Sequence, residues 1–532
     1  MQLYSLLFVL YMLSLLACYY AVARIFKRFQ WIVILVFSCI FYALVTNIET
    51  ISYGLFTLCV TYASSHVCAY IARYFSKRAK AIPDRTKRKR FKARAKRAQA
   101  LVLCLCVALI IVNLCYLKYW NTILFAFGAA SSTRSLGLLL PLGISFYTFQ
   151  ALAYVFDVYN QKYAPERNIL KLACFLFYFP QLVQGPINRF DKLSPALFSL
   201  HEAKDTHFAK ASLTFAYGML KKYVMADLLV DSISKIFNQD PTTLPGSVLV
   251  FGILLYSAQQ YGDFSGGIDM LEAASEMLGI RMQPNFRRPY FSISLADFWR
   301  RWHISLGLWM KDYVFYPLAL SRPFKYASKH IKKLLGDTSF ATHMSRTVPA
   351  GLANIFVFLL VGIWHGADMH FISWGLYNGI VIALSDMFRP LTQALATFLH
   401  IKQEGKGYHI FSILRTFIVV NIGWYFDRIE SFDHAISALV TSVCSFRADA
   451  FMQGLALAGV IGTYIAAFKL AVIAAIIVCG ISIVQEYGIE VRTWICARPF
   501  ALRAAIYIIV GFLLLLASNI GTSHGGFMYA NY

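Results

Sequence analysis

Long apolar runs are the feature that most constrains how this chain can fold. Three clear examples are residues 3–23, 100–117 and 504–520. Each has about the 17–25 residues that an α-helix needs to cross a bilayer. Because lipid offers no hydrogen bonds to the backbone, such runs form helices. The sequence contains about eleven runs of this length, so it predicts an all-α, polytopic membrane protein.

The composition agrees with a membrane domain. The chain has 532 residues, of which 58% are hydrophobic and only 14% are charged. The first run is too long for a cleaved signal and lacks a basic segment before it, so we expect a retained helix. Polar residues gather in the middle of the chain, which predicts three parts: spanning helices at 1–140, a catalytic core at 141–390 and further spanning helices at 391–532.

The net charge of +24 is concentrated between the apolar runs. The basic loop predicted at 73–99 is typical of a cytoplasmic segment, with attraction to anionic lipid or an acidic partner as an addition. Counting spans from this loop places both termini outside the cytoplasm. Aromatic residues are not interleaved with these cations, so we expect no nucleic-acid binding.

No metal site is predicted. The eleven cysteines lie mostly inside apolar runs and include no CxxC pair, which is typical of small buried hydrophobic residues. His365 and His370 are five residues apart, and therefore point in different directions on a helix. The sequence also has no HExxH motif.

Two groups of polar residues interrupt the apolar middle of the chain. Gln150 and Asp157 are seven apart and share a helical face, and Asp263 and Asp269 lie among glycines. Ionisable residues at membrane depth face protein or water and are functional candidates. A polar network that braces the helices is the alternative interpretation.

The segment 292–318 predicts one interfacial helix. Ser294 is placed to cap it, with Asp297 in the first turn, and Pro317 to end it. Its aromatic residues recur at helical spacing beside several cations, as in helices that lie at the headgroup level. The predicted stripe consists of Trp299, Trp302, Leu306, Trp309, Tyr313 and Tyr316.

Cations around this helix suggest a ligand. Arg300 and Arg301 lie on it and Arg288 precedes it. Because guanidinium groups bind phosphate through two hydrogen bonds, they suit the nucleotide of a coenzyme or a phosphopantetheine. Positive-inside topology explains the same charges without a ligand. His303, next to the stripe, is either a ligand-contacting residue or an ordinary amphipathic one.

A second histidine lies deeper in an apolar run. His365 stands between Gly362 and Gly366, and the run resumes near Phe371, so we expect two helices that meet at a break inside the protein. A neutral imidazole suits general-base work on a hydroxyl; a hydrogen-bonded core histidine is the alternative. Trp364 is a candidate for substrate contact.

Five stretches together make the chain resemble the membrane-bound O-acyltransferase family, in its branch that acylates bacterial polysaccharides, including alginate O-acetylation and teichoic-acid D-alanylation subunits. They occur in the family's order. They are "PLGISFYTFQALAYVFDVY" (141–159), "FPQLVQGPINRF" (179–190), "YGDFSGGIDM" (261–270), "PNFRRPYFSISLADFWRRWHISLGLWMKDYVFYPL" (284–318) and "GIWHGADMHFISWGLYNG" (362–379).

The resemblance implies a ring of tilted helices around a funnel, in a bacterial cytoplasmic membrane, with added interfacial and re-entrant helices. His303 and His365 match the two signature polar residues, and His365 matches the catalytic one. Asp263 and Arg288 are weaker candidates for supporting roles. The family implies no bound cofactor. An extracytoplasmic SGNH-hydrolase-like partner usually passes the acyl group on to the polysaccharide.

The C-terminal "FMYANY" (527–532) resembles the aromatic tail of this branch, where the position of Tyr529 is an acyl relay; anchoring at the interface is the alternative. Two donors compete: acetyl-CoA, and an acyl or aminoacyl carrier protein. The tail and the chain length favour acetyl transfer over D-alanyl transfer. A transporter or flippase is the other class of function, although no internal repeat supports it.

Overall fold

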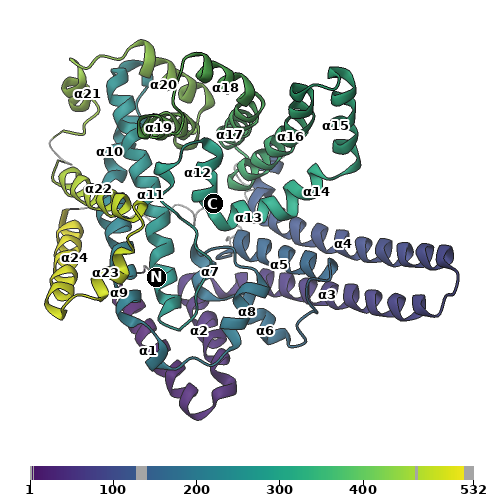
Figure 1. Cartoon of the computed structure of the whole chain (residues 1–532). Coiled ribbons are helices and arrows are strands. Elements are labelled where there is room, and N and C mark those ends of the chain that lie inside the picture. The colour runs from purple at the N-terminus through teal and green to yellow at the C-terminus, as the bar shows by residue number, and fades with distance from the viewer. Residues whose placement is uncertain (1–2, 4, 127–140, 462–464, 521–532) are drawn as a thin grey trace. The chain divides into compact units, whose positions relative to one another are not determined.

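The computed structural model describes residues 3, 5–126, 141–461 and 465–520, with side chains at all of these except 121–126. In these ranges every regular element is a helix (Figure 1), so the predicted all-α fold is confirmed. The helices form two compact units: unit 1 is Met1–Phe215 with Met270–Gln283, and unit 2 is Ala216–Asp269 with Pro284–Tyr532. The three-part division at 140 and 390 stays a prediction.

Unit 1 is built on a bundle of long helices. Within it, α3 packs against both α4 and α5, and α1 packs against α2. The helices are α1 (Leu6–Ile25), α2 (Gln30–Val45), α3 (Ile51–Lys80), α4 (Arg85–Ala126), α5 (Ile144–Tyr159), α6 (Ile169–Leu176), α7 (Phe179–Val183), α8 (Phe190–Phe198) and the start of α9 (Phe208–Met219).

Unit 2 contains the α16–α17 pair, which makes the most extensive helix packing in the chain as described. The helices are α10 (Val230–Phe237), α11 (Gly246–Glu276, most of it), α12 (Leu295–Arg301), α13 (Ile304–Met310), α14 (Tyr316–Ala319), α15 (Arg322–Leu335), α16 (Ser339–His365), α17 (Met369–Met387), α18 (Arg389–Phe398), α19 (Lys406–Arg428), α20 (Phe432–Cys444), α21 (Phe451–Leu457), α22 (Ile465–Glu486), α23 (Val491–Cys496) and α24 (Phe500–Ile520).

The shorter segments complete the two units. Six are 3₁₀ turns and two are π-helical. The 3₁₀ turns are Lys27–Phe29, Ile48–Thr50, Ala203–Asp205, Asp227–Leu229, Pro241–Thr243 and Pro289–Phe291; the π-helical segments are Leu220–Ala226 and Lys311–Phe315.

Eight of the described helices are long and apolar enough to cross a membrane, or nine if the bent pair α17–α18, which meets at 55°, is one span. The sequence predicted about eleven spans. The difference has a physical source: α5 has only 16 residues, and the long α11 carries Gln259, Gln260 and Asp263. These helices bury polar side chains among other helices instead of presenting an apolar surface.

The basic run at 73–99 is not a loop. Helix α3 continues to Lys80 and α4 begins at Arg85, so only residues 81–84 connect them. Arginine, lysine and alanine are good helix formers, and the spans therefore extend through the charged segment. The prediction of a loop was wrong here, because charge was taken as a sign of irregular backbone.

Candidate functional site

A break in the helical backbone positions His365. Helix α16 ends at His365, and α17 begins at Met369 after Gly366 in an extended conformation. The two helices approach at backbone contact: a Cβ added to Gly362 would lie 2.4 Å from the Phe371 carbonyl oxygen. The predicted break, with glycines that allow close packing, is confirmed.

Aromatic rings surround the His365 imidazole. Its centroid lies 4.8 Å from Trp364, 5.3 Å from Trp374 and 6.0 Å from Phe371. The residue is 5% exposed. Packing on three sides fixes the plane of the ring, and the apolar surround strengthens any electrostatic interaction that it makes.

The segment that carries His303 differs from its prediction. Ser294 does cap α12, since its Oγ accepts from the backbone N–H of Asp297 at 3.1 Å. The single helix predicted from Ser294 to Pro317 is wrong: α12 stops at Arg301, Trp302 is extended, and His303 has φ = 47°. The helical run resumes at Ile304 and continues past Pro317 to Ala319.

The helix is interrupted at His303 because the backbone of residues 285–287 forms hydrogen bonds with the segment on either side of it. The backbone N–H of Arg287 donates to the carbonyl of Arg301 at 2.9 Å, and that of Ile304 donates to the carbonyl of Asn285 at 2.9 Å. These bonds replace helical ones, and they hold His303 in the left-handed region, which non-glycine residues seldom occupy.

The Asn285 side chain sets the tautomer of His303. Its Oδ1 accepts from the backbone N–H of Ser305 at 3.0 Å and lies 3.1 Å from His303 Nδ1. Because the backbone N–H can only donate, this atom is the oxygen, and Nδ1 of His303 carries the proton. Burial lowers the pKa of His303 to about 3. The imidazole is therefore neutral at pH 7, with its lone pair on Nε2.

Both histidines line one cavity of about 540 Å³ in unit 2. Its wall is mainly apolar, with Arg300 and Lys311 as its cations. Trp364 lies beside it, 6.5 Å from His303 and 4.8 Å from His365 between ring centroids. The structure thus gathers these sequence-predicted residues around one cavity: His303, His365, Trp299, Arg300 and Trp302.

The remaining predicted residues lie elsewhere. Arg288 and Arg301 both pair with Glu486 of α22, and Arg301 also pairs with Asp297 at 3.1 Å. They brace unit 2 rather than line the cavity. Asp263 is buried against Lys222. Tyr529 lies outside the described residues.

The sequence pointed to Asp263 and Asp269 but not to the buried lysines that pair with them. Lys222, in the π-helical segment Leu220–Ala226, binds both Asp227, at 2.7 Å, and Asp263. Two carboxylates therefore share one ammonium group, and burial raises the pKa of Asp227 to about 7. Lys221 pairs with Asp269 at 2.6 Å. The signal was available, because lysines within the apolar "GMLKKYVMADLL" (218–229) satisfy the rule for buried ionisable residues.

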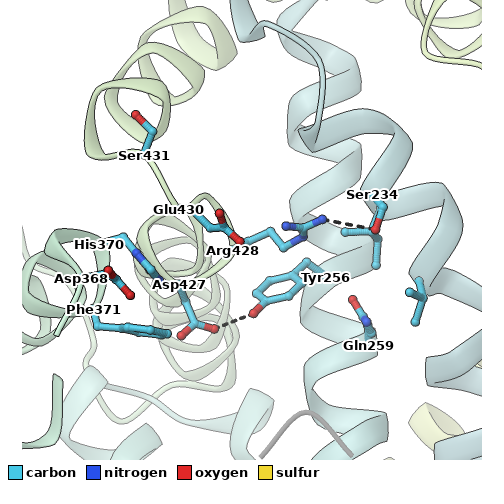
Figure 2. A pocket seen from close by; sticks show the side chains of 12 residues that line it. Ser234, Tyr256, Gln259, Asp368, His370, Phe371, Asp427, Arg428, Glu430 and Ser431 are labelled. Atoms are coloured by element: carbon cyan, nitrogen blue, oxygen red, sulfur yellow. Dashed lines mark hydrogen bonds between the residues drawn. The ribbon is translucent and has the colours of Figure 1, made fainter. Parts of the chain in front are cut away.

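A second, polar cavity of about 770 Å³ lies in the same unit. In Figure 2, Asp427 at the end of α19 accepts through Oδ2 from the Tyr256 hydroxyl at 2.6 Å, and Arg428 donates to the Ser234 hydroxyl at 3.4 Å. Asp368 and Glu430 add two carboxylates. Within the described residues, no three His, Cys, Asp or Glu side chains are arranged to hold a metal ion.

The stacked rings of Phe371 and His365 connect the lining of the polar cavity with that of the apolar cavity. Phe371 lines the polar cavity (Figure 2) and stacks on His365, which lines the apolar one. His370, the next residue back, also lines the polar cavity. The helix break therefore presents neighbouring residues to an apolar and a polar space.

Comparison with known proteins identifies the relatives of this chain. The model of the membrane-bound O-acyltransferase family matches residues 164–331. The probable alginate O-acetylase AlgI of Azotobacter vinelandii is 34% identical over 61% of this chain and 60% of its own. The peptidoglycan O-acetyltransferase of Helicobacter pylori is 30% identical, over 61% of each chain. The teichoic acid D-alanyltransferase of Bacillus subtilis is 25% identical over 55% of this chain and 70% of its own.

The family model covers the region that contains His303, and the pairwise comparisons cover more than half of the chain. This chain spans about 60% of the length of the alginate and peptidoglycan relatives. The described parts of the chain before and after residues 164–331 contain eight helices that are long and apolar enough to cross a membrane. The predicted resemblance to the membrane-bound O-acyltransferase family is confirmed by the match to the family model and by relatives that are named as O-acetylases and acyl-group transferases.

Proposed function

We propose that this protein transfers an acyl group from a thioester to a hydroxyl, with His365 as the general base. The supporting observation is the single cavity lined by His303 and His365. His365 takes the hydroxyl proton as the oxygen attacks the thioester carbonyl. The C–S bond then breaks, and the proton passes to the departing thiolate.

His303 serves the donor side of this reaction. Asn285 holds its proton on Nδ1, so Nε2 can accept a hydrogen bond within the cavity. Arg300 and Lys311 provide charge for a phosphate-bearing donor. The apolar remainder of the wall suits the arm and acyl group of a thioester.

The polar cavity serves the acceptor. Its carboxylates and hydroxyls, among them Asp427 and Tyr256, can hold a hydroxylated molecule by hydrogen bonds. Phe371 offers an aromatic face of the kind that binds a sugar ring. Because Phe371 also stacks on His365, an acceptor hydroxyl at this point would approach the base.

An acetyl group is the favoured cargo, because the alginate and peptidoglycan O-acetylating relatives are more similar to this chain than the D-alanyltransferase is. We propose that the donor, acetyl-CoA, is cytoplasmic and that the acceptor is an envelope polysaccharide outside a bacterial cytoplasmic membrane. An SGNH-hydrolase-like partner completes the transfer, with Tyr529 as a relay. D-alanyl transfer from a carrier protein is the alternative.

The test measures transfer of labelled acetyl from acetyl-CoA by the full chain in membrane vesicles, with envelope polymer and partner present. His365→Ala should lower transfer at least a thousandfold, because the base acts directly on the reacting hydroxyl. His409→Ala, an exposed histidine on α19, is the matched control and should retain full activity. Wild-type transfer by His365→Ala at normal protein levels would refute the assignment. Transfer of labelled D-alanine instead of acetate would refute the cargo only.

A further inference from the structure

A basic cavity in unit 1 lies outside the site described above. It has a volume of about 690 Å³ and is formed between the C-terminal half of α3 and residues 158–167. No aspartate or glutamate lines it. It contains four guanidinium or ammonium groups, which come from Arg73, Lys77, Lys80 and Arg167.

Helix geometry collects three of these cations. Arg73, Lys77 and Lys80 are four and three residues apart, so they lie on one face of α3 in successive turns. His66 and Ala69 continue that face toward the apolar part of the helix. Like charges at this spacing repel one another in the absence of an anion.

The opposite wall of the cavity is fixed by hydrogen bonds. The Tyr62 hydroxyl donates to the carbonyl oxygen of Arg167 at 2.7 Å. The Tyr154 hydroxyl accepts from the backbone N–H of Glu166 at 2.7 Å. The backbone N–H of Lys162 donates to the carbonyl of Asp157 at 2.9 Å as the chain turns through Gln161, which has φ = 59°. The loop is thus tied to α3 and α5, and the cavity is preformed.

The nearby carboxylates are engaged with other groups. Glu166 Oε1 accepts from the backbone N–H of Asn168 at 2.9 Å. Asp157 and Asp191 both pair with Lys162, at 3.1 and 2.9 Å. Among the residues that the structure describes, no carboxylate lies within 4.0 Å of any of the four cavity cations. The positive charge around the cavity is therefore not balanced by the protein.

We propose that this cavity binds the phosphate group of an anionic ligand. A phosphate compensates the repulsion among the cations, and Arg73 and Arg167 can each donate two hydrogen bonds to it. The cations lie at one end of the membrane-span candidate Ile48–Lys80, where lipid headgroups are found. The phosphate thus comes from an anionic phospholipid or from a soluble phosphate compound. The proposal does not depend on the acyl-transfer chemistry.

The experiment compares two triple variants of the full chain purified in detergent. Arg73→Gln, Lys77→Gln and Lys80→Gln remove the cavity cations on α3. Lys87→Gln, Lys89→Gln and Arg90→Gln remove the same charges from α4, where none lines the cavity. Phosphatidylglycerol, zwitterionic phosphatidylcholine and coenzyme A are titrated separately, and binding is measured by native mass spectrometry.

We expect saturable binding of phosphatidylglycerol that is on the order of a hundredfold weaker in the cavity variant, at about fivefold for each cation. The α4 variant should bind within about twofold of the wild type. Arg167→Gln, on the loop side, should weaken binding about fivefold. Coenzyme A bound with this same pattern, and phosphatidylglycerol without it, would assign the cavity to a soluble phosphate compound.

Two results would overturn the proposal. One is equal weakening in the cavity and α4 variants, because binding would then depend on net charge alone. The other is the absence of saturable binding for both anionic probes. Retained acyl transfer in a variant that has lost binding would leave the proposed function intact, so the two proposals fail separately.

Discussion

The two histidines of the apolar cavity are held in place by different forces. Hydrogen bonds from Asn285 and its backbone hold His303 on a left-handed backbone. His365 stands at a helix end and is fixed by the rings of Trp364, Phe371 and Trp374. A methyl group added to a glycine at the helix break should therefore disturb His365, and loss of the acceptor on Asn285 should disturb His303.

The difference has a consequence for reactivity. A hydrogen bond selects a tautomer and a direction, so His303 presents the same nitrogen at all times. The rings of Trp364, Phe371 and Trp374 fix the plane of His365 at the break between α16 and α17. We infer that His303 positions the acyl donor and that His365 acts as the general base.

Among substitutions that keep both histidines, the largest effect should come from Gly362→Ala. The added Cβ would lie 2.4 Å from the Phe371 carbonyl and 3.5 Å from the Gly375 Cα, so α16 and α17 must separate. We expect about 3 kcal/mol of destabilisation and roughly a hundredfold less acyl transfer. Thermal unfolding in detergent and the vesicle transfer assay measure the two effects.

A matched glycine provides the control. Gly480, inside α22, has no atom within 4 Å of an added Cβ. Alanine favours helix more than glycine does, so Gly480→Ala should be neutral or stabilising. A wild-type melting temperature and activity in Gly362→Ala would show that backbone contact does not hold His365.

Asn285→Ala tests the hydrogen-bonded histidine and should have a smaller effect. The substitution leaves the donors of His303 and Ser305 without their shared acceptor, which should destabilise the fold by about 2 kcal/mol. Acyl transfer should fall roughly thirtyfold. Asn285→Asp keeps an oxygen at this position and should recover most of the melting temperature. Its negative charge also raises the pKa of His303, which should shift the acid side of the activity profile upward. If Asn285→Ala and Asn285→Asp have the same activity and pH profile, Asn285 does not set the tautomer.

The same contrast explains which parts of the molecule the sequence could predict. Apolar length predicts spans, and the runs at 3–23, 100–117 and 504–520 lie within or close to α1, α4 and α24. The helix break after His365 could also be predicted locally, because Gly362 and Gly366 lie within a few residues of it. These features depend on neighbours in sequence.

The environment of His303 could not be predicted in this way. Periodic aromatic residues indicated one helix from 294 to 316, and they do recur at helical spacing. The break arises from Asn285, eighteen residues before His303, and no local pattern signals that pairing. Lys222 is an intermediate case. The sequence shows that it lies in an apolar run, but it does not show which two carboxylates bind it.

The smallest effect concerns pH and tests whether His303 is buried in its neutral form. Its pKa falls from the usual 6.5 to about 3 on folding, so between these values the unfolded chain binds more protons at this site than the folded protein. Stability should therefore decrease as the pH drops through this window, by about 1.4 kcal/mol at pH 5.5 from this residue. His303→Gln should lose less melting temperature than the wild type between pH 7.5 and pH 5.5, whereas the exposed His409→Gln should match the wild type. An identical loss in all three proteins would mean that His303 is hydrated enough to take up a proton, and hydrogen bonding by Asn285 would then have to hold an imidazolium instead.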